Sequence, residues 1–391
     1  MVTPLVHPAP PRGTRPKDRR SQIRTAAAAL FYERGYGQVS VADVAASVNV
    51  GPSALYRHYS GKAQLLYEAI DVTINAFSEM VGQLPTRDLE GIALTSARTA
   101  TAHRALGVLW QREARNLPAD QQAVLRHRLR EAVGALAETL REIRPELSVD
   151  QAAFLAAAGV NTMNSISFHR LSLPEDEMEE LLAALTMRVL TYPFPPPPRA
   201  SCAMEPEAPR RTRREEIGDA AVRLFAEHGF DAVSLDDVGA AIGIAGPSIY
   251  RHFASKQDLL HDSLGRGFAL LQDSLVDAIE QGTSPADRLR RLSDSYVGLT
   301  LRASDLITNL IAESRNLAPE HAEMAQLAQL GYIGRWVDLV RAIRPEEPAT
   351  VARIKVQAAQ MTASSLARTT YLRGLPGFAE DVREICWRLQ Q

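Results

Sequence analysis

Residues 23–70 read IRTAAAALFYERGYGQVSVADVAASVNVGPSALYRHYSGKAQLLYEAI, and residues 217–264 read IGDAAVRLFAEHGFDAVSLDDVGAAIGIAGPSIYRHFASKQDLLHDSL. The two stretches align without a gap at a constant offset of 194 residues. Both keep a Tyr-Arg-His triplet, at 56–58 and 250–252, and both have a lysine four residues after it. The chain therefore contains an internal repeat, and each copy shows which features of the other are under constraint.

Helical periodicity dominates both copies. In the first, the apolar residues at positions 23, 27, 30 and 31 form one stripe of a helix. Gly35 follows where a left-handed C-terminal cap is expected, and Gly229 repeats it. No part of the chain alternates with the period of a strand, so we expect an all-α fold.

A second and a third helix follow at very short spacing. Ser40 begins the second helix with Asp43 three residues on, which is the pattern of a capping box. Residues 49–51 separate it from a third helix that begins near Pro52. Two short helices joined by so short a turn have the geometry that places the second helix in the major groove of DNA.

The third helix is expected to read DNA. Its exposed side carries Ser53, Ala54, Tyr56, Arg57 and His58. Small side chains let a helix approach base edges closely, and the tyrosine and histidine can reach phosphates. The lysine at position 62 begins a fourth helix, although a cation there opposes the helix dipole. A phosphate bound jointly by the ammonium and the helix N-terminus would remove this conflict, and a solvated lysine is the alternative.

Both copies resemble the N-terminal domain of the TetR family of transcriptional regulators, on the strength of LYRHYSGKAQLL at 55–66 and IYRHFASKQDLL at 249–260. The resemblance implies that each three-helix helix-turn-helix domain is followed by a helical domain that binds a small molecule and dimerises through its last two helices. It also implies DNA contacts in the first copy at Ser40, Pro52, Ser53, Ala54, Tyr56, Arg57, His58 and Lys62. In the second copy the corresponding residues are Ser234, Gly246, Pro247, Ser248, Tyr250, Arg251, His252 and Lys256.

Motifs farther along the chain repeat at an offset of 200, such as REIRPE at 141–146 and RAIRPE at 341–346. Six residues were therefore inserted in the second half between the opening segment and these motifs. The whole chain is a duplication. The proline-rich stretch at 191–209 separates the halves. The expected divisions are a basic flexible arm (1–20), a helix-turn-helix domain (21–68), a helical effector and dimerisation domain (69–192), a linker (193–210), a second helix-turn-helix domain (211–262) and a second helical domain (263–391).

An ordinary TetR-family member is a homodimer whose two recognition helices meet a palindrome. This chain already carries two such helices, so we expect one polypeptide to form a pseudo-dimer as a monomer, because tethering raises the effective concentration of the second half. The contact between the halves is expected from helices over 148–173, 175–190, 350–375 and 377–389. Packing within each half explains their alanines as well.

Positive charge is concentrated in the first copy. Residues 12–62 carry nine basic and three acidic residues, whereas residues 210–262 carry seven and nine. We call the third helix of each copy its reader. Basic residues precede the first reader at 12, 15, 17, 19 and 20, and the second at 210, 211, 213 and 214. Such residues can bind the minor groove or the phosphates of DNA. A proline is also displaced by one position between the readers. We therefore expect a non-palindromic double-stranded DNA operator, with the first reader supplying more of the affinity.

Aromatic and polar residues of the middle helices are candidates for an effector pocket, and ordinary core packing is the alternative for each. These residues are Trp110, Phe154, Asn164, Phe168 and His169 in the first half and Tyr296, Trp336 and Tyr371 in the second. The apolar lining suggests a small apolar effector, and the resemblance to arginine-rich tandem regulators makes a lipid or steroid-like molecule the expected class. Repression is the family default.

Composition and motifs exclude several other classes. With 46% hydrophobic and 23% charged residues the chain reads as a soluble globular protein, with no apolar run near the roughly 18 residues of a membrane span. Two cysteines cannot form a disulfide framework, which fits the cytoplasm. Signatures of hydrolases, P-loop enzymes and dinucleotide enzymes are missing, so we expect no catalytic residue, metal or cofactor. The remaining alternative is a ligand-binding or protein-interaction module in which one helix-turn-helix no longer binds DNA.

Overall fold

The structure, a computed structural model, describes residues 19–84, 88–195, 212–244 and 246–391, without the side chains of Gly246 and Pro247. Nearly all of the expected arm (1–20) and most of the expected linker (193–210) lie outside these residues. The secondary structure of the described part is entirely helical, which confirms the expected class. The chain divides into two compact units, Met1–Thr191 and Tyr192–Gln391. No helix in the described part is both long and apolar enough to cross a membrane.

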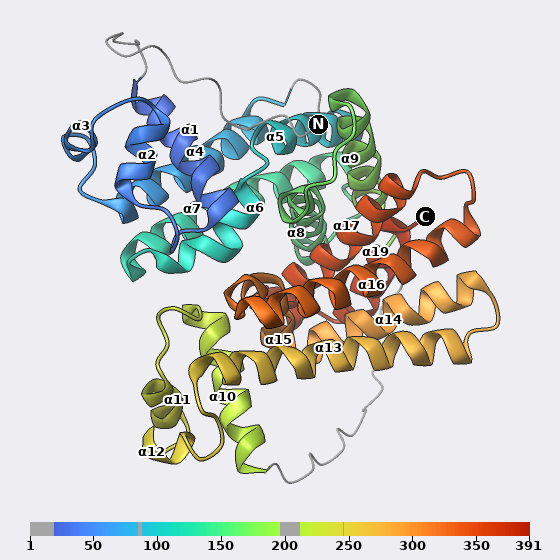
Figure 1. The fold of residues 1–391 in the computed structure, drawn as a ribbon. Coiled ribbons are helices and arrows are strands. Elements are labelled where there is room, and N and C mark those ends of the chain that lie inside the picture. The colour runs from blue at the N-terminus through green and yellow to red at the C-terminus, as the bar shows by residue number, and fades with distance from the viewer. Residues whose placement is uncertain (1–18, 85–87, 196–211, 245) are drawn as a thin grey trace. The chain divides into compact units, whose positions relative to one another are not determined.

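Unit 1, coloured blue to green in Figure 1, begins with three helices that form the helix-turn-helix and continues with a helical domain. Its elements are α1 (Arg19–Arg34), α2 (Val41–Ser47), α3 (Pro52–Tyr56), α4 (Lys62–Gly82), α5 (Leu89–Ala102), α6 (Leu106–Val108), the π-helix η1 (Leu109–Glu113), the 3-10 helix η2 (Ala114–Asn116), α7 (Ala119–Ile143), α8 (Val149–Asn164), the 3-10 helix η3 (Ser165–Phe168) and α9 (Glu175–Leu190).

Unit 2, coloured yellow-green to red, follows the same order. Its elements are α10 (Arg213–His228), α11 (Leu235–Ala241), α12 (Gly246–Ile249), α13 (Lys256–Gln281), α14 (Pro285–Arg302), α15 (Ser304–Ala312), the 3-10 helix η4 (Ser314–Asn316), α16 (Pro319–Ile343), α17 (Ala349–Ala367), α18 (Thr370–Arg373) and α19 (Phe378–Leu389). α13 has 26 residues where α4 has 21, so most of the six-residue insertion lengthens this helix.

The first helix of each unit ends at a glycine with positive φ. Gly35 (φ 83°) donates its N–H to the carbonyl of Phe31, and Gly229 (φ 85°) does the same to Phe225, both at 2.9 Å. The two phenylalanines are fully buried, so the chain changes direction next to core residues. Only glycine adopts such a φ without strain. The expected positive φ is confirmed, although Gly229 has ψ 152° and therefore lies outside the left-handed helical region that we expected.

The fourth helix of each unit joins the helix-turn-helix to the helical domain. α4 runs through residue 68 and α13 through residue 262, the positions where we expected domain boundaries. The apolar core of the first helix-turn-helix continues along α4 through Ile70 and Ile74 to Leu125 of α7. The helix-turn-helix and part of the helical domain of unit 1 therefore share one apolar core. The domain division itself stays a prediction.

α8 is shorter than the helix expected over 148–173. It ends at Asn164, and after η3 the chain is extended at His169. The guanidinium of Arg104 donates to the carbonyls of Ile166, His169 and Leu171, at 2.9, 2.7 and 3.0 Å. In a continuing helix these carbonyls would accept backbone N–H groups four residues on. Here they accept from Arg104 instead, which stabilises the end of the helix. The expected helix over 350–375 is likewise divided, into α17 and α18.

Candidate nucleic-acid interface

The turn between the second and third helix has the same backbone in both units. Asn49 (φ 56°) and Gly243 (φ 71°) occupy equivalent positions in the left-handed region. After each of them an N–H returns to the second helix, from Val50 to the carbonyl of Ala45 and from Ile244 to that of Gly239, both at 3.0 Å. Asparagine and glycine are the residues that tolerate this conformation best. The two readers are therefore presented by the same turn.

The first reader, α3, has one buried and one exposed side. Leu55 and the following Tyr59 are buried at 0% and 2% exposure. Pro52, Ser53, Tyr56, Arg57 and His58 are exposed and Ala54 is partly exposed, as expected. Tyr56 exposes 59% of its surface, an unusual amount for so large an aromatic residue. Polar aromatic side chains held in solvent on a rigid helix are suited to contact a ligand outside the protein.

The second reader, α12, repeats this arrangement. Ile249 and Phe253 are buried, whereas Tyr250 is 58% exposed and Arg251 is exposed. His252 is partly exposed, and Ser248 lies within hydrogen-bond distance of Arg251, at 3.4 Å. Gly246 and Pro247 belong to the helix, and their side chains lie outside the described atoms. The tyrosines at 56 and 250 are thus exposed to the same degree.

Ser40 and Ser234 form the expected capping boxes. Each hydroxyl accepts the N–H of the aspartate three residues on at 3.1 Å and donates to that aspartate's carboxylate at 2.6 Å. These bonds hold the pKa of Asp43 and Asp237 below the usual value. A serine hydroxyl has one proton, and here the carboxylate accepts it, so the hydroxyl would have to turn away from the carboxylate to donate to a phosphate. The capping role expected for the two serines is therefore present, whereas their contact with phosphate stays a prediction.

Lys62 and Lys256 begin α4 and α13 as expected, but they already have partners within the protein. Each ammonium lies over an aromatic ring at equivalent positions, 4.1 Å from the ring centre of Tyr36 and 4.2 Å from that of Phe230. Lys256 also donates to the carbonyl of Phe230 at 2.8 Å. Desolvation lowers the pKa of Lys62. The sequence analysis missed these cation–π contacts, which give a structural reason for the repeated lysine.

Clefts lie beside both lysines, and their linings differ. In unit 2 a cleft of about 510 Å³ brings Ser234, Tyr250 and Lys256 together with Asp231 and Asp236. Positions 37 and 42 of the first copy, which correspond to the two aspartates, are glycine and alanine. In unit 1 a cleft of about 620 Å³ lies on the other side of the lysine, toward Tyr67 and Gln121. The surface beside Lys256 is therefore more acidic than the equivalent surface beside Lys62.

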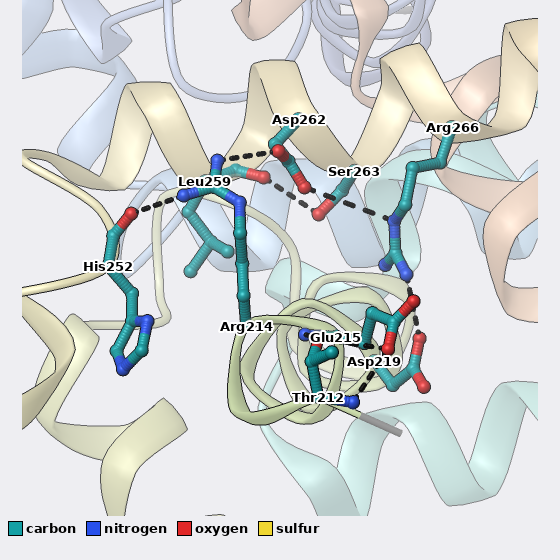
Figure 2. A network of polar contacts seen from close by, with 9 residues as sticks. All are labelled: Thr212, Arg214, Glu215, Asp219, His252, Leu259, Asp262, Ser263 and Arg266. Carbon is teal, nitrogen blue, oxygen red and sulfur yellow. Dashed lines mark hydrogen bonds and ion pairs between the residues drawn. The ribbon is translucent and has the colours of Figure 1, made fainter. Parts of the chain in front are cut away.

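The arginines before each reader are not all part of an arm. Arg20 and Arg214 lie at equivalent positions in α1 and α10 and bind a carboxylate of the fourth helix, Arg20 to Glu68 at 2.6 Å and Arg214 to Asp262 at 2.7 Å. Figure 2 shows that Arg214 also donates to the carbonyl of His252, at the end of the second reader. These two arginines thus tie the first helix to the fourth and lie in helices, and their expected contact with DNA stays a prediction.

A second ion pair extends the network in Figure 2. Arg266 of α13 contacts Asp219 of α10 at 3.1 Å and approaches Asp262 at 4.0 Å.

Two further arginines of the expected arms lie in helices, where Arg19 donates to the carbonyl of Val48 at 3.2 Å and Arg213 pairs with Glu216 at 2.6 Å. The remaining basic residues of the arms, at 12, 15, 17, 210 and 211, lie outside the described residues.

A buried carboxylate joins the helical domain of unit 1 to its helix-turn-helix. Glu113, fully buried at the end of η1, accepts the backbone N–H of Tyr36 at 3.0 Å and the guanidinium of Arg112 at 2.7 Å. Arg112 in turn reaches the carbonyl of Tyr32 at the end of α1. In unit 2, Asn309 donates to the carbonyl of Val222 at 2.8 Å. Sequence repetition drew attention to Glu113 but could not reveal its partner 77 residues away.

The effector candidates of unit 1 differ in burial and in the core that they join. Trp110 lies in η1 and packs against the core of the helix-turn-helix. Phe154 is buried in α8, whereas Asn164 and Phe168 are partly exposed near its end. His169 is buried, and its Nδ1 lies 3.3 Å from the guanidinium of Arg104 and accepts the N–H of Leu171.

In unit 2 two of the three candidates come together. Trp336 and Tyr296 are buried in edge-to-face contact with ring centres 5.6 Å apart, and Tyr332 packs on the other side of Trp336 at 5.8 Å. Tyr296 shares a hydrogen bond of 2.9 Å with Ser364, and burial raises its pKa to about 12. Tyr371 is 55% exposed and does not belong to this interior, because α18 places it on the surface.

Comparison with known proteins shows which family the two helix-turn-helix domains match. The model described as bacterial regulatory proteins, tetR family, matches residues 23–69 and 217–262. The HTH-type transcriptional repressor KstR of Mycolicibacterium smegmatis is 29% identical over 141 residues, 36% of this chain and 67% of KstR. KstR2 of Mycobacterium tuberculosis is 37% identical over 82 residues, 21% of this chain and 40% of KstR2.

A solved structure of the ketosteroid transcriptional regulator KstR2 of Mycobacterium tuberculosis is 21% identical, with a TM-score of 0.37, over 43% of this chain and 96% of that one. In sequence, the chain spans between two fifths and two thirds of the lengths of the two repressors. Both matches to the family model fall on the repeated helix-turn-helix domains described above. The two helix-turn-helix domains are thus tandem copies of the domain described by the tetR-family model, and the chain is similar to transcriptional repressors of that family.

Proposed function

We propose that one chain binds a non-palindromic double-stranded DNA operator as a single-chain pseudo-dimer, and that a small apolar effector releases it. The observation that carries this proposal is that both units present a reader on the same turn, with Tyr56 59% and Tyr250 58% exposed. An ordinary member needs two chains to present two readers. The proposed DNA contacts are those expected from the resemblance, including Ser40 and Ser234.

The two readers are proposed to contribute unequally. Phosphate contacts supply much of the affinity of such proteins for DNA. Asp231 and Asp236 line the cleft of unit 2 that holds Lys256, and the first copy has no acidic residue at either position. Carboxylates beside a phosphate repel it. The first reader is therefore proposed to provide more of the binding free energy.

Replacing Asp231 by glycine and Asp236 by alanine, the residues found in the first copy, is expected to raise affinity for the operator about threefold to tenfold at low salt. The reason is the loss of two like charges next to the proposed phosphate site. Titration of labelled operator measures the change, and the gain should shrink as salt rises. An unchanged affinity at low salt would support the alternative function, in which the second helix-turn-helix no longer binds DNA.

The effector is proposed to be lipid-like or steroid-like, and to bind within a helical domain. The buried cluster of Tyr296, Tyr332 and Trp336 supports an apolar interior in unit 2. The positions 200 residues earlier hold Ser96, Ala132 and Leu136, which are also buried. Because the two interiors are lined so differently, we propose that a given effector is accommodated by one unit. Repression is proposed as the mode, since KstR and KstR2 are named as repressors, and the cytoplasm as the place of action.

The pseudo-dimer predicts one chain per operator at nanomolar concentration. Binding to a footprinted operator should follow a one-to-one isotherm and fall steeply with salt, because several phosphates are contacted. A protease site placed within residues 196–211 provides the control. Cleavage should leave affinity unchanged at high concentration but make it fall on dilution, because the halves are no longer tethered. Two uncut chains per operator at nanomolar concentration would overturn the proposal.

A further inference from the structure

Lys62, the lysine expected to bind a phosphate in unit 1, is held in place by an aromatic ring. Its Nζ lies 4.1 Å from the ring centre of Tyr36 and donates no hydrogen bond within the part of the chain that the structure describes. In unit 2 the equivalent Nζ, that of Lys256, donates to the carbonyl of Phe230 at 2.8 Å. An ammonium group has three donors. The position of the Lys62 ammonium thus depends on Tyr36, and its donors remain for a ligand.

The residue that carries this ring is fixed from the helical domain of the same unit. Tyr36 follows Gly35, whose positive φ reverses the chain after α1, and its backbone N–H belongs to no helix. One carboxylate oxygen of Glu113 accepts this N–H at 3.0 Å. The other oxygen accepts the guanidinium of Arg112 at 2.7 Å. Glu113 therefore fixes the backbone of the residue whose ring lies under the ammonium of Lys62.

Glu113 also acts on Lys62 through its charge. The carboxylate is 0% exposed, and a buried charge is costly unless other groups compensate it. Desolvation lowers the pKa of Lys62, and the negative charges of Glu113 and Asp43 oppose this change. A nearby opposite charge favours the ionised form of a group. The hydrogen bond to Tyr36 and the field of the carboxylate thus both stabilise a charged lysine at this place.

The equivalent glutamate of unit 2 has a different setting. Glu313 is also 0% exposed, and its carboxylate accepts the side-chain amide of Asn316 at 2.6 Å. In unit 1 the amide of Asn116 donates instead to the backbone carbonyl of Glu113, at 2.9 Å. Glu113 ends the π-helix η1, whereas the residues 200 positions on lie in the α-helix α15 and its C-terminal cap. Because π-helical turns are frequent at functional sites, this difference favours a separate role for Glu113.

We propose that Glu113 is a positioning residue for Lys62, by which the helical domain of unit 1 holds the ammonium over Tyr36 for a phosphate of DNA. The inference rests on the proposed function, because it takes Lys62 as a phosphate contact. It adds a residue outside the helix-turn-helix that sets the affinity of the first reader. Glu113 is fully buried and acts only through the lysine. A glutamate with a purely structural role would stabilise unit 1 without any particular effect on Lys62.

The reactivity of Lys62 tests the positioning without DNA. Mass spectrometry can follow acylation of each Nζ separately, because the chain has only four lysines, at positions 17, 62, 256 and 355. Glu113→Ala removes a charge that favours the ammonium form and releases the ring of Tyr36. More of the neutral, reactive amine should then be present, so Lys62 should be acylated about twofold to fivefold faster while Lys256 keeps its rate.

Two further variants control the acylation experiment. Glu113→Gln keeps an oxygen for the N–H of Tyr36 but loses the charge, so it should give a smaller increase in the rate at Lys62. Glu138→Gln removes the same charge from an exposed position of α7 and should change no rate. Circular dichroism and the unfolding midpoint establish that each variant is folded. A rate at Lys62 that stays unchanged in folded Glu113→Ala would overturn the proposal.

A double-mutant cycle tests the role in DNA binding. Glu113→Ala should weaken operator binding by about threefold, although it removes a negative charge, and the same change made in a Lys62→Ala chain should alter affinity by less than about twofold. Equal losses in both chains would show that Glu113 supports the reader as a whole, which contradicts the inference. If Lys62→Ala itself binds normally, the phosphate contact of the proposed function is wrong, and the acylation rates still decide whether Glu113 positions the lysine.

Discussion

Trp336→Ala is expected to lower the free energy of unfolding of unit 2 by about 3–5 kcal/mol. The indole is 1% exposed and packs edge-to-face against two tyrosines, at 5.6 and 5.8 Å between ring centres. Its Nε1–H donates to the side chain of Gln390, which in turn donates to Ser293 at 3.0 Å. Alanine would leave a cavity and also break this buried chain of hydrogen bonds. Urea denaturation followed by circular dichroism measures the loss.

Two variants make this expectation specific. Tyr371→Ala, at a position 55% exposed, should change the free energy of unfolding by no more than about 0.5 kcal/mol. Trp336→Phe keeps an aromatic ring but removes the donor, and it should fall between the wild type and alanine. If Trp336→Ala and Tyr371→Ala unfold at the same urea concentration, the aromatic cluster does not stabilise unit 2, and the proposed difference between the two interiors fails with it.

The helix-turn-helix could be predicted from the sequence because its signals are local. Ser40 and Asp43 are three residues apart, and the capping box that they predict is present. Gly35 and Gly229 mark the chain reversal by a φ that only glycine adopts easily. Each signal involves residues within one or two helical turns, and the second copy repeats it. Periodicity and caps are sufficient for elements of this kind.

Contacts between distant residues were beyond the same reasoning. The end of α8 depends on Arg104, more than 60 residues before the carbonyls that it binds. Arg20 could be assigned to a DNA-binding arm because nothing near it in sequence indicates its pairing with Glu68, 48 residues on. The burial of Glu113 against Tyr36 is of the same kind. Local patterns predict that a residue is charged and repeated, whereas its partner is decided by how the helices pack.

The candidate effector residues show a second limit. Trp110 and Trp336 are both aromatic residues in middle helices, yet one packs on the helix-turn-helix core and the other lies inside unit 2. Tyr371 is exposed, because the helix expected over 350–375 is interrupted after Ala367. Residue type alone predicts that a side chain will be buried more often than not. It does not predict which of several interiors will contain it.

Lys62→Ala is expected to weaken operator binding more than Lys256→Ala does. Loss of one phosphate contact should lower affinity by a factor of several and reduce the slope of affinity against salt by about one. Lys256 loses less because Asp231 and Asp236 already oppose an anion in its cleft, and because its ammonium donates to the carbonyl of Phe230. Gel-shift titrations of both variants against the same operator, at two or more salt concentrations, measure the order and the slopes.

The cation–π contacts require a control, because each lysine also holds the fourth helix against an aromatic ring. Lys62→Met keeps an apolar stem over Tyr36 without the charge, so a purely structural role predicts that methionine restores binding better than alanine. A phosphate role predicts that methionine and alanine bind equally weakly and show the same reduced salt slope, while Lys62→Arg retains binding. The reverse order of the two positions, with Lys256→Ala the weaker binder, would show that the acidic cleft of unit 2 does not reduce its contribution.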